Sequence, residues 1–219
     1  MLLSAFPPGR TWHLLRCSLM FGLAMLVSAC ASISQDPLPA GLTEQPPADW
    51  AQRQNMLSNL DQWQLNGKLA VRQPGENASA VINRWTQDRE QYDLHLSSSF
   101  LGMGRTELSG SPGFIEIRMA NGDEYRSSDP ENLISAATGW QLPIDSLVWW
   151  VRGLPDPGRD YRLLFDEQGA LAEIRQQGWN IRYERWQAFI ADTPALPARL
   201  TARKGDRLVR LVITNWQPL

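Results

Sequence analysis

Cysteine and histidine are scarce in this sequence of 219 residues, which has two of each. Cys17 and His13 lie in an N-terminal segment that we expect to be removed, so the mature chain keeps only Cys30 and His95. A single cysteine allows no internal disulfide and no thiolate metal site. With one histidine and no second thiol, we expect no catalytic zinc and no other bound metal.

Sequence motifs of catalysis are also missing. Gly67-Lys68 lacks the upstream glycine and the following Ser or Thr of a phosphate-binding loop, and no G-x-S-x-G nucleophile elbow occurs. A serine triad would have to use His95, which falls on the polar side of an expected strand. We therefore expect no catalytic residues and no enzyme activity.

Charge of one sign is not concentrated along the chain. The formal net charge is −2, and no basic block occurs that could follow a phosphate backbone. Nucleic acid is therefore not an expected partner. The sequence also has no internal repeat, so a repeat architecture is not expected either.

The one long apolar run, residues 19–27, identifies the N-terminus as a secretory signal. Basic residues precede the run, and the small pair Ser28-Ala29 follows it, which is the order of a signal peptide. Cys30 comes directly after the small residues and completes a bacterial lipobox. The alternative is a transmembrane anchor with an incidental cysteine, but the run is too short to span a bilayer comfortably.

The lipobox predicts that residues 1–29 are removed and that Cys30 carries a covalent acyl and diacylglycerol lipid, with no other cofactor. Several acyl chains anchor a protein firmly, whereas one chain binds reversibly. Ala31 stands where an Asp usually keeps a lipoprotein at the inner membrane of enteric-type bacteria. This sorting rule places the protein at the outer membrane, anchored by lipid on the periplasmic face.

The mature chain divides into a tether and one domain. Residues 30–48 are rich in Pro, Ser and Gln without apolar periodicity, which predicts a lipidated flexible tether. Residues 49–219 have the length of a single domain with a sizeable core. The chain has ten tryptophans, and nine remain after Trp12 is removed. Each alone fits a core position, but such a surplus also suits a lined cavity.

Alternation of apolar and polar residues predicts antiparallel strands over most of the domain. Residues 78–88 are β-like with ambiguous facing, and residues 208–216 are apolar on both sides, as in a covered strand. Asn121-Gly122 predicts a tight hairpin. The expected inward-facing residues are Trp63, Leu65, Leu69 and Val71; Tyr92, Leu94 and Leu96; Ile115, Ile117 and Met119; Tyr161, Leu163 and Phe165; and Trp179, Ile181 and Tyr183.

Three short helices accompany the strands. A capping box of Asp49 and Gln52 predicts a helix over residues 50–60, and Asp129-Pro130 predicts one over residues 131–138. Few helices and no alternating βαβ pattern favour a mainly β fold of the α+β type, with a twisted antiparallel sheet capped by helices on its concave face. The third helix follows Pro143, with an apolar face of Leu147, Trp150, Val151 and Leu154.

An apolar loop follows the strand that ends near Leu96. Phe100, Leu101 and Met103 lie among serines and glycines, where polar residues are expected. These side chains could fold back onto the core. Alternatively, the loop has an exposed apolar tip that inserts shallowly into lipid.

Taken together, these features resemble the LolB family, the outer-membrane lipoprotein receptors of lipoprotein localisation, along nearly the whole mature chain. Each motif is weak alone, and their order and spacing make the resemblance specific. The motifs are the lipobox at Cys30, Trp63 with Gly67-Lys68-Leu69-Ala70, Leu101-Gly102 before Thr106-Glu107-Leu108, Gly139 with Leu142-Pro143, Leu147 with Trp149 and Gly153-Leu154-Pro155, Trp179 with Tyr183, Leu196-Pro197, and Asn215-Trp216.

The resemblance implies an incomplete, strongly curved antiparallel β-barrel, with a helical lid over an apolar cavity. It implies that a monomer accepts mature lipoproteins from the periplasmic carrier LolA and places them in the outer membrane, without nucleotide hydrolysis. Leu101 matches the family's protruding leucine, although Phe100 stands where a proline is often found. No motif identifies the cavity lining, for which strand facing suggests Trp63, Leu65, Leu94, Leu96, Ile117, Leu147, Trp150, Trp179, Ile181 and Tyr183.

Three other functions stay open on sequence grounds. A generic hydrophobe carrier at the outer membrane explains the tryptophans and the lipobox equally well. A lipid-modifying enzyme would need a nucleophile or metal that the sequence does not offer. A lipoprotein that only scaffolds other envelope proteins would need no cavity.

Overall fold

A computed structural model describes residues 38–98 and 104–219. The segment Pro39–Leu219 forms one compact unit. Its helices are α2 (Trp50–Ser58), α3 (Pro130–Thr138) and α4 (Ile144–Trp150). Its strands are β1 (Gln62–Gln73), β2 (Glu76–Asp88), β3 (Gln91–Ser98), β4 (Gly104–Ser111), β5 (Phe114–Arg118), β6 (Glu124–Ser127), β7 (Tyr161–Phe165), β8 (Leu171–Gln176), β9 (Trp179–Gln187), β10 (Leu196–Lys204) and β11 (Arg207–Pro218).

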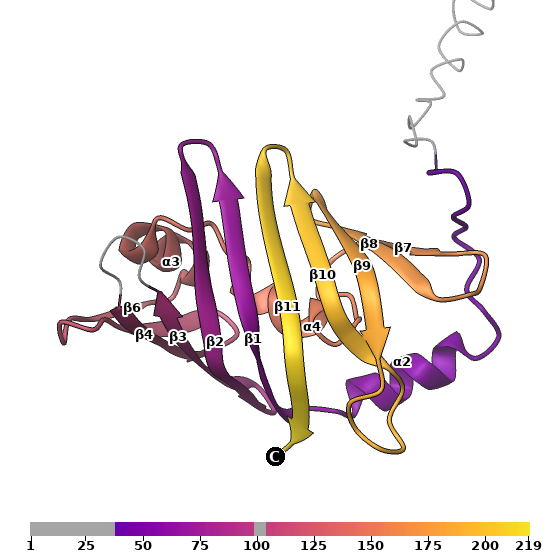
Figure 1. Ribbon diagram of the computed structural model, residues 1–219, viewed down its shortest axis with the longest axis horizontal. Helices are drawn as coiled ribbons and strands as arrows, with labels where there is room; N and C mark the ends of the chain where they lie inside the picture. The colour runs from indigo at the N-terminus through magenta and orange to yellow at the C-terminus, as the bar shows by residue number, and fades with distance from the viewer. Residues whose placement is uncertain (1–37, 99–103) are drawn as a thin grey trace, which may run out of the picture. The chain divides into compact units, whose positions relative to one another are not determined.

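All of these strands form one 11-stranded antiparallel sheet in the order β6-β5-β4-β3-β2-β1-β11-β10-β9-β8-β7 (Figure 1). The first and last strands pair at its middle, so β2–β6 extend to one side and β7–β10 to the other. The edge strands β6 and β7 are not paired with each other in the described chain, so the curved sheet stays open. This confirms the predicted mainly β fold, an incomplete antiparallel barrel with a few helices.

The sheet bends at Gly67 in β1. The pairing of β1 shifts register beside Gly67 on both sides, toward β11 and toward β2. A Cβ atom at this position would stand 2.2 Å from the carbonyl oxygen of Val212, so glycine permits the close approach of β11. Such bulges bend a sheet and increase its twist. Gly67-Lys68 therefore marks a bend of the sheet.

The same irregularity explains the ambiguous facing of residues 78–88. In β2, Ala80 and Ile82 are buried before the register shift, and Trp85 and Gln87 are buried after it. The inward face therefore passes from even-numbered to odd-numbered residues. A single period-two pattern cannot describe such a strand.

The predicted inward face of residues 161–165 is confirmed for Phe165 and wrong for Tyr161. Tyr161 is exposed and Leu163 is half-buried, whereas Leu164 and Phe165 are both buried. The pairing of β7 with β8 shifts register between Leu164 and Phe165, and this bulge breaks the alternation. In the hairpin that follows β5, Met119 lies just past the strand and is half-buried.

The prediction that residues 208–216 are covered on both faces is also wrong. In β11, Val209, Leu211 and Ile213 are buried, whereas Leu208 and Val212 alternate with them on the other face and are half-buried. One face of β11 therefore stays accessible.

The predicted turn and cap signals are confirmed at two places. Asp129 caps α3 by accepting a 3.2 Å hydrogen bond from the backbone N–H of Asn132, and Gly139 ends the helix in the left-handed region. At the predicted Asn121-Gly122 hairpin, the N–H of Met119 donates to the carbonyl of Asp123 at 2.9 Å. These are local signals, so the sequence alone carries them.

The predicted capping box of α2 is wrong. The helix begins at Trp50 as expected, but the Asp49 side chain makes no capping hydrogen bond, because its backbone is helical rather than extended. α2 ends at Ser58 rather than Leu60. The third predicted helix, α4, ends at Trp150, and Leu154 lies beyond it but is buried as expected.

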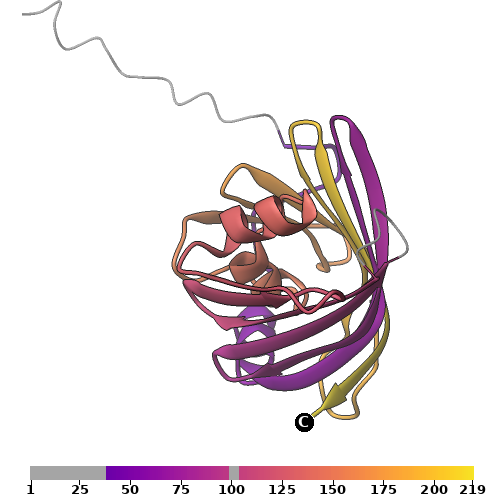
Figure 2. The ribbon, with the colours of Figure 1, turned by 90° about the vertical axis from the view of Figure 1, so that its left-hand side faces the viewer.

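Both α3 and α4 lie on the concave side of the sheet (Figure 2). α3 packs against β5 and β6 and touches α4. The segment before α2 also contacts the sheet: Thr43 and Phe165 exchange backbone hydrogen bonds of 2.9 and 2.8 Å, and Glu44 pairs with Arg162. The expected tether of residues 30–48 is therefore not free throughout, because this part lies along the edge of β7.

Candidate functional site

The candidate site is an enclosed cavity between the concave face of the sheet and the two helices. Its wall comes from β1–β4, β11, α3, α4 and the segment that joins the helices. The lining residues are Leu69, Ile82, Trp85, Leu94, Leu96, Leu108, Ile134, Thr138, Trp140, Leu142, Ile144, Leu147 and Leu211.

This cavity is apolar and closed. Thr138 is the one hydroxyl residue of the lining, and its Oγ1 donates to the carbonyl of Ile134 at 2.7 Å and accepts from the backbone N–H of Trp140 at 3.1 Å. The volume is about 10 Å³, room for a single water molecule. A hydrocarbon chain would enter only if the helices or the side chains beneath them moved.

Three of the residues expected from strand facing line this cavity, namely Leu94, Leu96 and Leu147. The others are buried in the same core but do not line it. They are Trp63, Leu65, Ile117, Trp150, Trp179, Ile181 and Tyr183.

Trp150 of α4 fills the interior on the side of β8 and β9. Its Nε1–H donates to Oε1 of Gln176 at 2.9 Å, and its carbonyl accepts from the Tyr183 hydroxyl at 2.9 Å. Its ring lies 6.2 Å from that of Trp179. Burial raises the pKa of Tyr183 well above its ordinary value, so the hydroxyl remains a donor at neutral pH. These contacts explain why the expected residues of β9 pack against α4 rather than around an open space.

Trp85 and Trp140 are lining residues that sequence reasoning missed. Both are 1 % exposed, and among the described residues neither indole N–H has a hydrogen-bond partner. An unpaired buried donor costs about 1–3 kcal/mol, so each such group needs an explanation. The bulge in β2 hid the facing of Trp85, and Trp140 lies in a segment without periodicity.

Arg152 holds α4 from outside the cavity and was also missed. Its side chain is 3 % exposed and donates to the carbonyls of Val148, Leu57 and Leu60 at 3.3, 3.5 and 3.0 Å. The guanidinium lies 4.5 Å from the centre of the Trp149 ring. Desolvation by burial lowers the pKa of Arg152 to about 10, although the charge of Asp61 opposes this shift. The arginine thus ties α4 to the end of α2.

Gln73 holds the end of α3 from the tip of β1. Its Nε2 donates to the carbonyl of Gly139 at 2.6 Å, and its Oε1 accepts from the N–H of Gln141 at 3.4 Å. Both contacts are at least partly exposed to solvent. α3 is therefore held by fewer polar contacts than α4, and these contacts are more exposed to solvent.

Cys30 and the apolar-loop residues Phe100, Leu101 and Met103 lie outside the described residues. The ends of the loop are described: Ser98 of β3 and Gly104 of β4 are paired neighbours. Across residues 38–98 and 104–219, no helix is long and apolar enough to span a bilayer. In the same residues, no group of three His, Cys, Asp or Glu side chains is placed to hold a metal ion.

The structure belongs to the class of open antiparallel half-barrels with helices over an apolar cavity. A similar fold is seen in the crystal structure of a domain from Vibrio parahaemolyticus, described as an outer membrane lipoprotein-sorting protein. It has a TM-score of 0.52 and 6 % identity, and the match covers 77 % of this chain and 90 % of that chain. At this identity the likeness concerns the fold alone.

Sequence comparison identifies the family. The family model described as outer membrane lipoprotein LolB matches residues 61–216. The LolB protein of Marinobacter nauticus is 62 % identical over 201 residues, covering 90 % of this chain and 97 % of that protein. The LolB protein of Pseudomonas syringae is 36 % identical over 205 residues, covering 93 % and 97 %. The chain belongs to the LolB family of outer-membrane lipoproteins, which confirms the resemblance and the outer-membrane location predicted from sequence.

Proposed function

We propose that this protein accepts mature lipoproteins from the periplasmic carrier LolA, holds their acyl chains in the apolar cavity, and places them in the outer membrane. The observation that carries the proposal is the enclosed apolar cavity beneath α3 and α4, in a chain of the LolB family. An apolar cavity with few polar groups is the kind of site that takes a hydrophobic ligand.

The reaction is a transfer rather than a chemical conversion. Each methylene gains about 0.8 kcal/mol when it leaves water, so several acyl chains are very costly to expose. Passage from one apolar cavity to another avoids this cost, and the two hydrophobic contributions nearly cancel. A small difference in affinity then sets the direction, and nucleotide hydrolysis is not required.

Opening of the cavity is part of this proposal. With room for one water, the closed cavity cannot hold an acyl chain. Movement of α3 opens it at the smallest cost, because α3 supplies Ile134 and Thr138 to the wall and lies at the edge of the sheet beside β6. Loss of the Gln73 contacts would be the first step.

The unpaired indole N–H groups of Trp85 and Trp140 can donate hydrogen bonds to a polar part of the cargo. A lipidated cysteine carries ester and amide carbonyls at the head of its acyl chains, and carbonyl oxygens accept hydrogen bonds from Trp N–H groups. We assign the N–H groups of Trp85 and Trp140 to these carbonyls. Such bonds would favour a lipoprotein over a plain hydrocarbon and would satisfy both donors.

The membrane step is assigned to the residues that lie outside the described part of the chain. Cys30 would carry the lipid that anchors the protein at the periplasmic face of the outer membrane. Leu101, with Phe100 and Met103, would enter the acyl boundary and promote release of the cargo. Substitution Leu101→Glu should impair insertion more than acyl binding, and normal insertion by this variant would overturn the assignment to the loop.

The deciding experiment mixes carrier that is loaded with a labelled lipoprotein with the mature chain carrying Cys30→Ser, in the absence of ATP and membrane. The cargo should move to this chain. Trp85→Phe and Trp140→Phe should each weaken retention about fivefold, the size of one net hydrogen bond. Trp63→Phe is the matched control, because its buried N–H is also unpaired and its ring packs behind Trp85, 5.7 Å between ring centres, without lining the cavity.

Three results would contradict the proposal or its assignment of the indoles. Failure of the folded protein to accept cargo from the carrier, with uptake of free fatty acid intact, would favour a generic hydrophobe carrier. Failure of both would favour a scaffolding lipoprotein. Equal losses in all three tryptophan variants would show that the indoles act through packing and not through carbonyl recognition.

A further inference from the structure

The convex face of the sheet carries an unusual excess of cations at its centre. Nine of the ten charged residues in the adjacent strands β1, β11, β10 and β9 are Lys or Arg, and Glu184 is the one carboxylate. The chain as a whole has a net charge of −2. Charge is therefore segregated in the fold, although it is mixed along the sequence.

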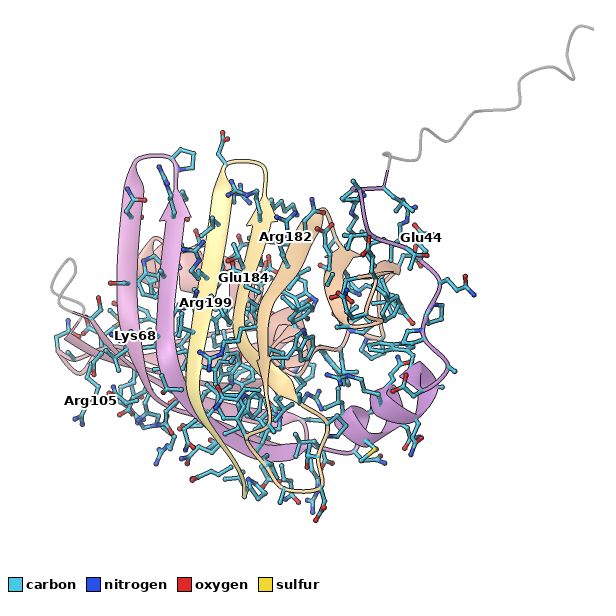
Figure 3. All side chains as sticks on the ribbon, turned by 45° about the vertical axis from the view of Figure 1, so that its right-hand side comes forward. Glu44, Lys68, Arg105, Arg182, Glu184 and Arg199 are labelled. Carbon is cyan, nitrogen blue, oxygen red and sulfur yellow. The ribbon has the colours of Figure 1, made fainter. Side chains whose placement is uncertain are left out.

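Strand pairing arranges these cations in rows. One row across the strands runs from Lys68 through Val212 to Arg199, and the next contains Arg210 and Arg182. A third row runs from Arg72 through Leu208 to Arg203. We call this set the basic face, and Figure 3 shows three of its members on the outer side of the strands. The basic face consists of Lys68, Arg72, Arg182, Arg199, Arg203 and Arg210, all exposed.

On the other side of the sheet, three cations of β2, β5 and β6 are paired with nearby carboxylates. On β5 and β6, Nε of Arg118 lies 2.8 Å from Glu124, and Nε of Arg126 lies 2.6 Å from Glu116. On β2 and β3, Arg84 lies 3.2 Å from Asp93. Each of these cations has a carboxylate on its own or the neighbouring strand.

The basic face lacks such partners. Its ion pairs are long: Arg210 lies 3.9 Å from Glu184, and Arg182 lies 3.6 Å from Glu173. Among the described residues, the other four members of the basic face form no ion pair. Like charges on neighbouring strands destabilise a sheet. This arrangement is therefore suited to anions that come from outside the protein.

We propose that the basic face docks on the anionic phospholipid headgroups of the membrane to which the protein is anchored. The proposal rests on the proposed lipid anchor at Cys30. Thirteen residue steps separate Cys30 from Thr43, which is fixed to β7. Such a segment spans at most about 45 Å, so Thr43 and the edge strand β7 stay within that distance of the membrane surface. Clustered cations near an anionic membrane surface are attracted to it, each strengthening binding about fivefold.

Docking by this face would set the orientation of the cavity. α3 and α4 lie behind the sheet when the convex face is viewed (Figure 1), and the side view places them on the opposite, concave side (Figure 2). A domain that rests on the basic face therefore presents its helices and cavity away from the lipid. The docked state is the one that receives cargo from a soluble carrier, and delivery requires the domain to turn.

Vesicle binding tests the proposal with the mature chain carrying Cys30→Ser, which has no acyl anchor. The probes are vesicles of phosphatidylcholine with and without phosphatidylglycerol, at low and high salt. Binding should require phosphatidylglycerol and fall with salt. The triple variant Lys68→Gln, Arg199→Gln and Arg203→Gln should bind at least tenfold more weakly. The matched control, Arg84→Gln, Arg118→Gln and Arg126→Gln, removes the same charge and should bind almost as the parent does.

Several outcomes would overturn the proposal. They are absence of phosphatidylglycerol dependence, equal losses in the two triple variants, or weakened binding to the carrier in solution with vesicle binding intact. The last result would assign the basic face to an acidic protein. Cargo uptake from the carrier without membrane should be unchanged in the triple variant, so this test fails or succeeds separately from the proposed transfer function.

A second measurement tests the orientation. A fluorescent label at Ala70→Cys, between Lys68 and Arg72, should be quenched by headgroup-quencher lipids in phosphatidylglycerol vesicles. The same label at Ala136→Cys, on the exposed side of α3, should not be quenched. Stronger quenching at Ala136 would place the cavity side against the membrane and contradict the docked state.

Discussion

The two helices over the concave face are held in different ways. α4 is tied to the core by Trp150 through Gln176 and Tyr183, and to α2 by the buried guanidinium of Arg152. α3 is held at its end by Gln73, through contacts that are partly exposed. Local opening costs the least free energy where buried contacts are few. The comparison indicates that α4 is a fixed part of the core, and it supports α3 as the part that moves in the proposed transfer.

The largest effect on this comparison should come from Arg152. Arg152→Met keeps the length of the side chain but removes the charged donor to the carbonyls of Leu57 and Leu60, of which Leu57 still accepts the backbone N–H of Leu60. We expect the free energy of unfolding to fall by about 3 kcal/mol, because hydrogen bonds to a charged group are lost and the buried Leu60 carbonyl stays unpaired. Denaturant unfolding measures this. A loss below about 1 kcal/mol would mean that Arg152 does not anchor α4.

Trp150→Phe should have the next largest effect. The ring still fills the space, but Gln176 loses the indole donor. We expect a loss of about 1–2 kcal/mol in unfolding free energy, together with faster hydrogen exchange in α4. The matched control is Trp149→Phe, whose ring is only partly buried. Equal losses in the two variants would show that the contact with Gln176 contributes little.

Asp145, in the first turn of α4, should make the stability of this helix depend on pH. Oδ1 of Asp145 is buried without a partner, while Oδ2 accepts a long 3.4 Å hydrogen bond from the Gly113 N–H. Burial raises the pKa of Asp145; the hydrogen bond from Gly113 opposes this shift, and the charge of Asp156 adds to it. The folded state therefore prefers the protonated acid. Its contribution to stability is complete below the pKa of Asp145 in the unfolded chain, and it is lost as the pH rises through the higher pKa of the folded protein.

Asp145→Asn imitates the protonated form. We expect this variant to be more stable than the parent by about 0.5 kcal/mol at pH 7, a small value because the site is half exposed. The difference should disappear in acid, where the parent is protonated as well. Urea unfolding at several pH values checks this. A variant that is less stable than the parent at pH 7 would show that the carboxylate is favoured by its position in the helix.

The smallest change in stability should come from Gln73→Ala, which removes the contacts at the end of α3. We expect a loss below about 0.5 kcal/mol, because the bonds are partly exposed and water replaces them. Hydrogen exchange should nevertheless become faster in α3 and stay unchanged in α4, and cargo uptake should accelerate. Gln141→Ala is a control that retains the backbone N–H to which Gln73 binds. Unchanged exchange in α3 would contradict its role as the moving part.

Features that depend on residues close together in the chain could be predicted from the sequence alone. Period-two alternation identified β1, β3 and β9, and the Asp129 cap and the Asn121-Gly122 turn were recognised from neighbouring residues. Alternation also predicted which side chains are buried. It could not separate those at the cavity from those that α4 covers, because this depends on where a helix distant in sequence packs.

Features that depend on pairing were not visible in the sequence. Trp85 was missed because a bulge changes the phase of β2, and Arg152 because two of its acceptors, Leu57 in α2 and Leu60 just after it, lie 92 or more positions away. The basic face was missed for a similar reason. Lys68, Arg182 and Arg199 are far apart in the chain, so no basic block exists until the strands pair.

The most direct test of the central claim locates the acyl chains of the cargo. A lipoprotein with photoactivatable groups at the ends of its acyl chains is loaded on the carrier, transferred to the mature chain carrying Cys30→Ser, and crosslinked, and the modified residues are identified by mass spectrometry. The account predicts crosslinks to the cavity lining, such as Ile134, Leu96 and Leu142, with faster hydrogen exchange in α3 than in α4. Successful transfer with crosslinks confined to residues outside the lining would contradict it.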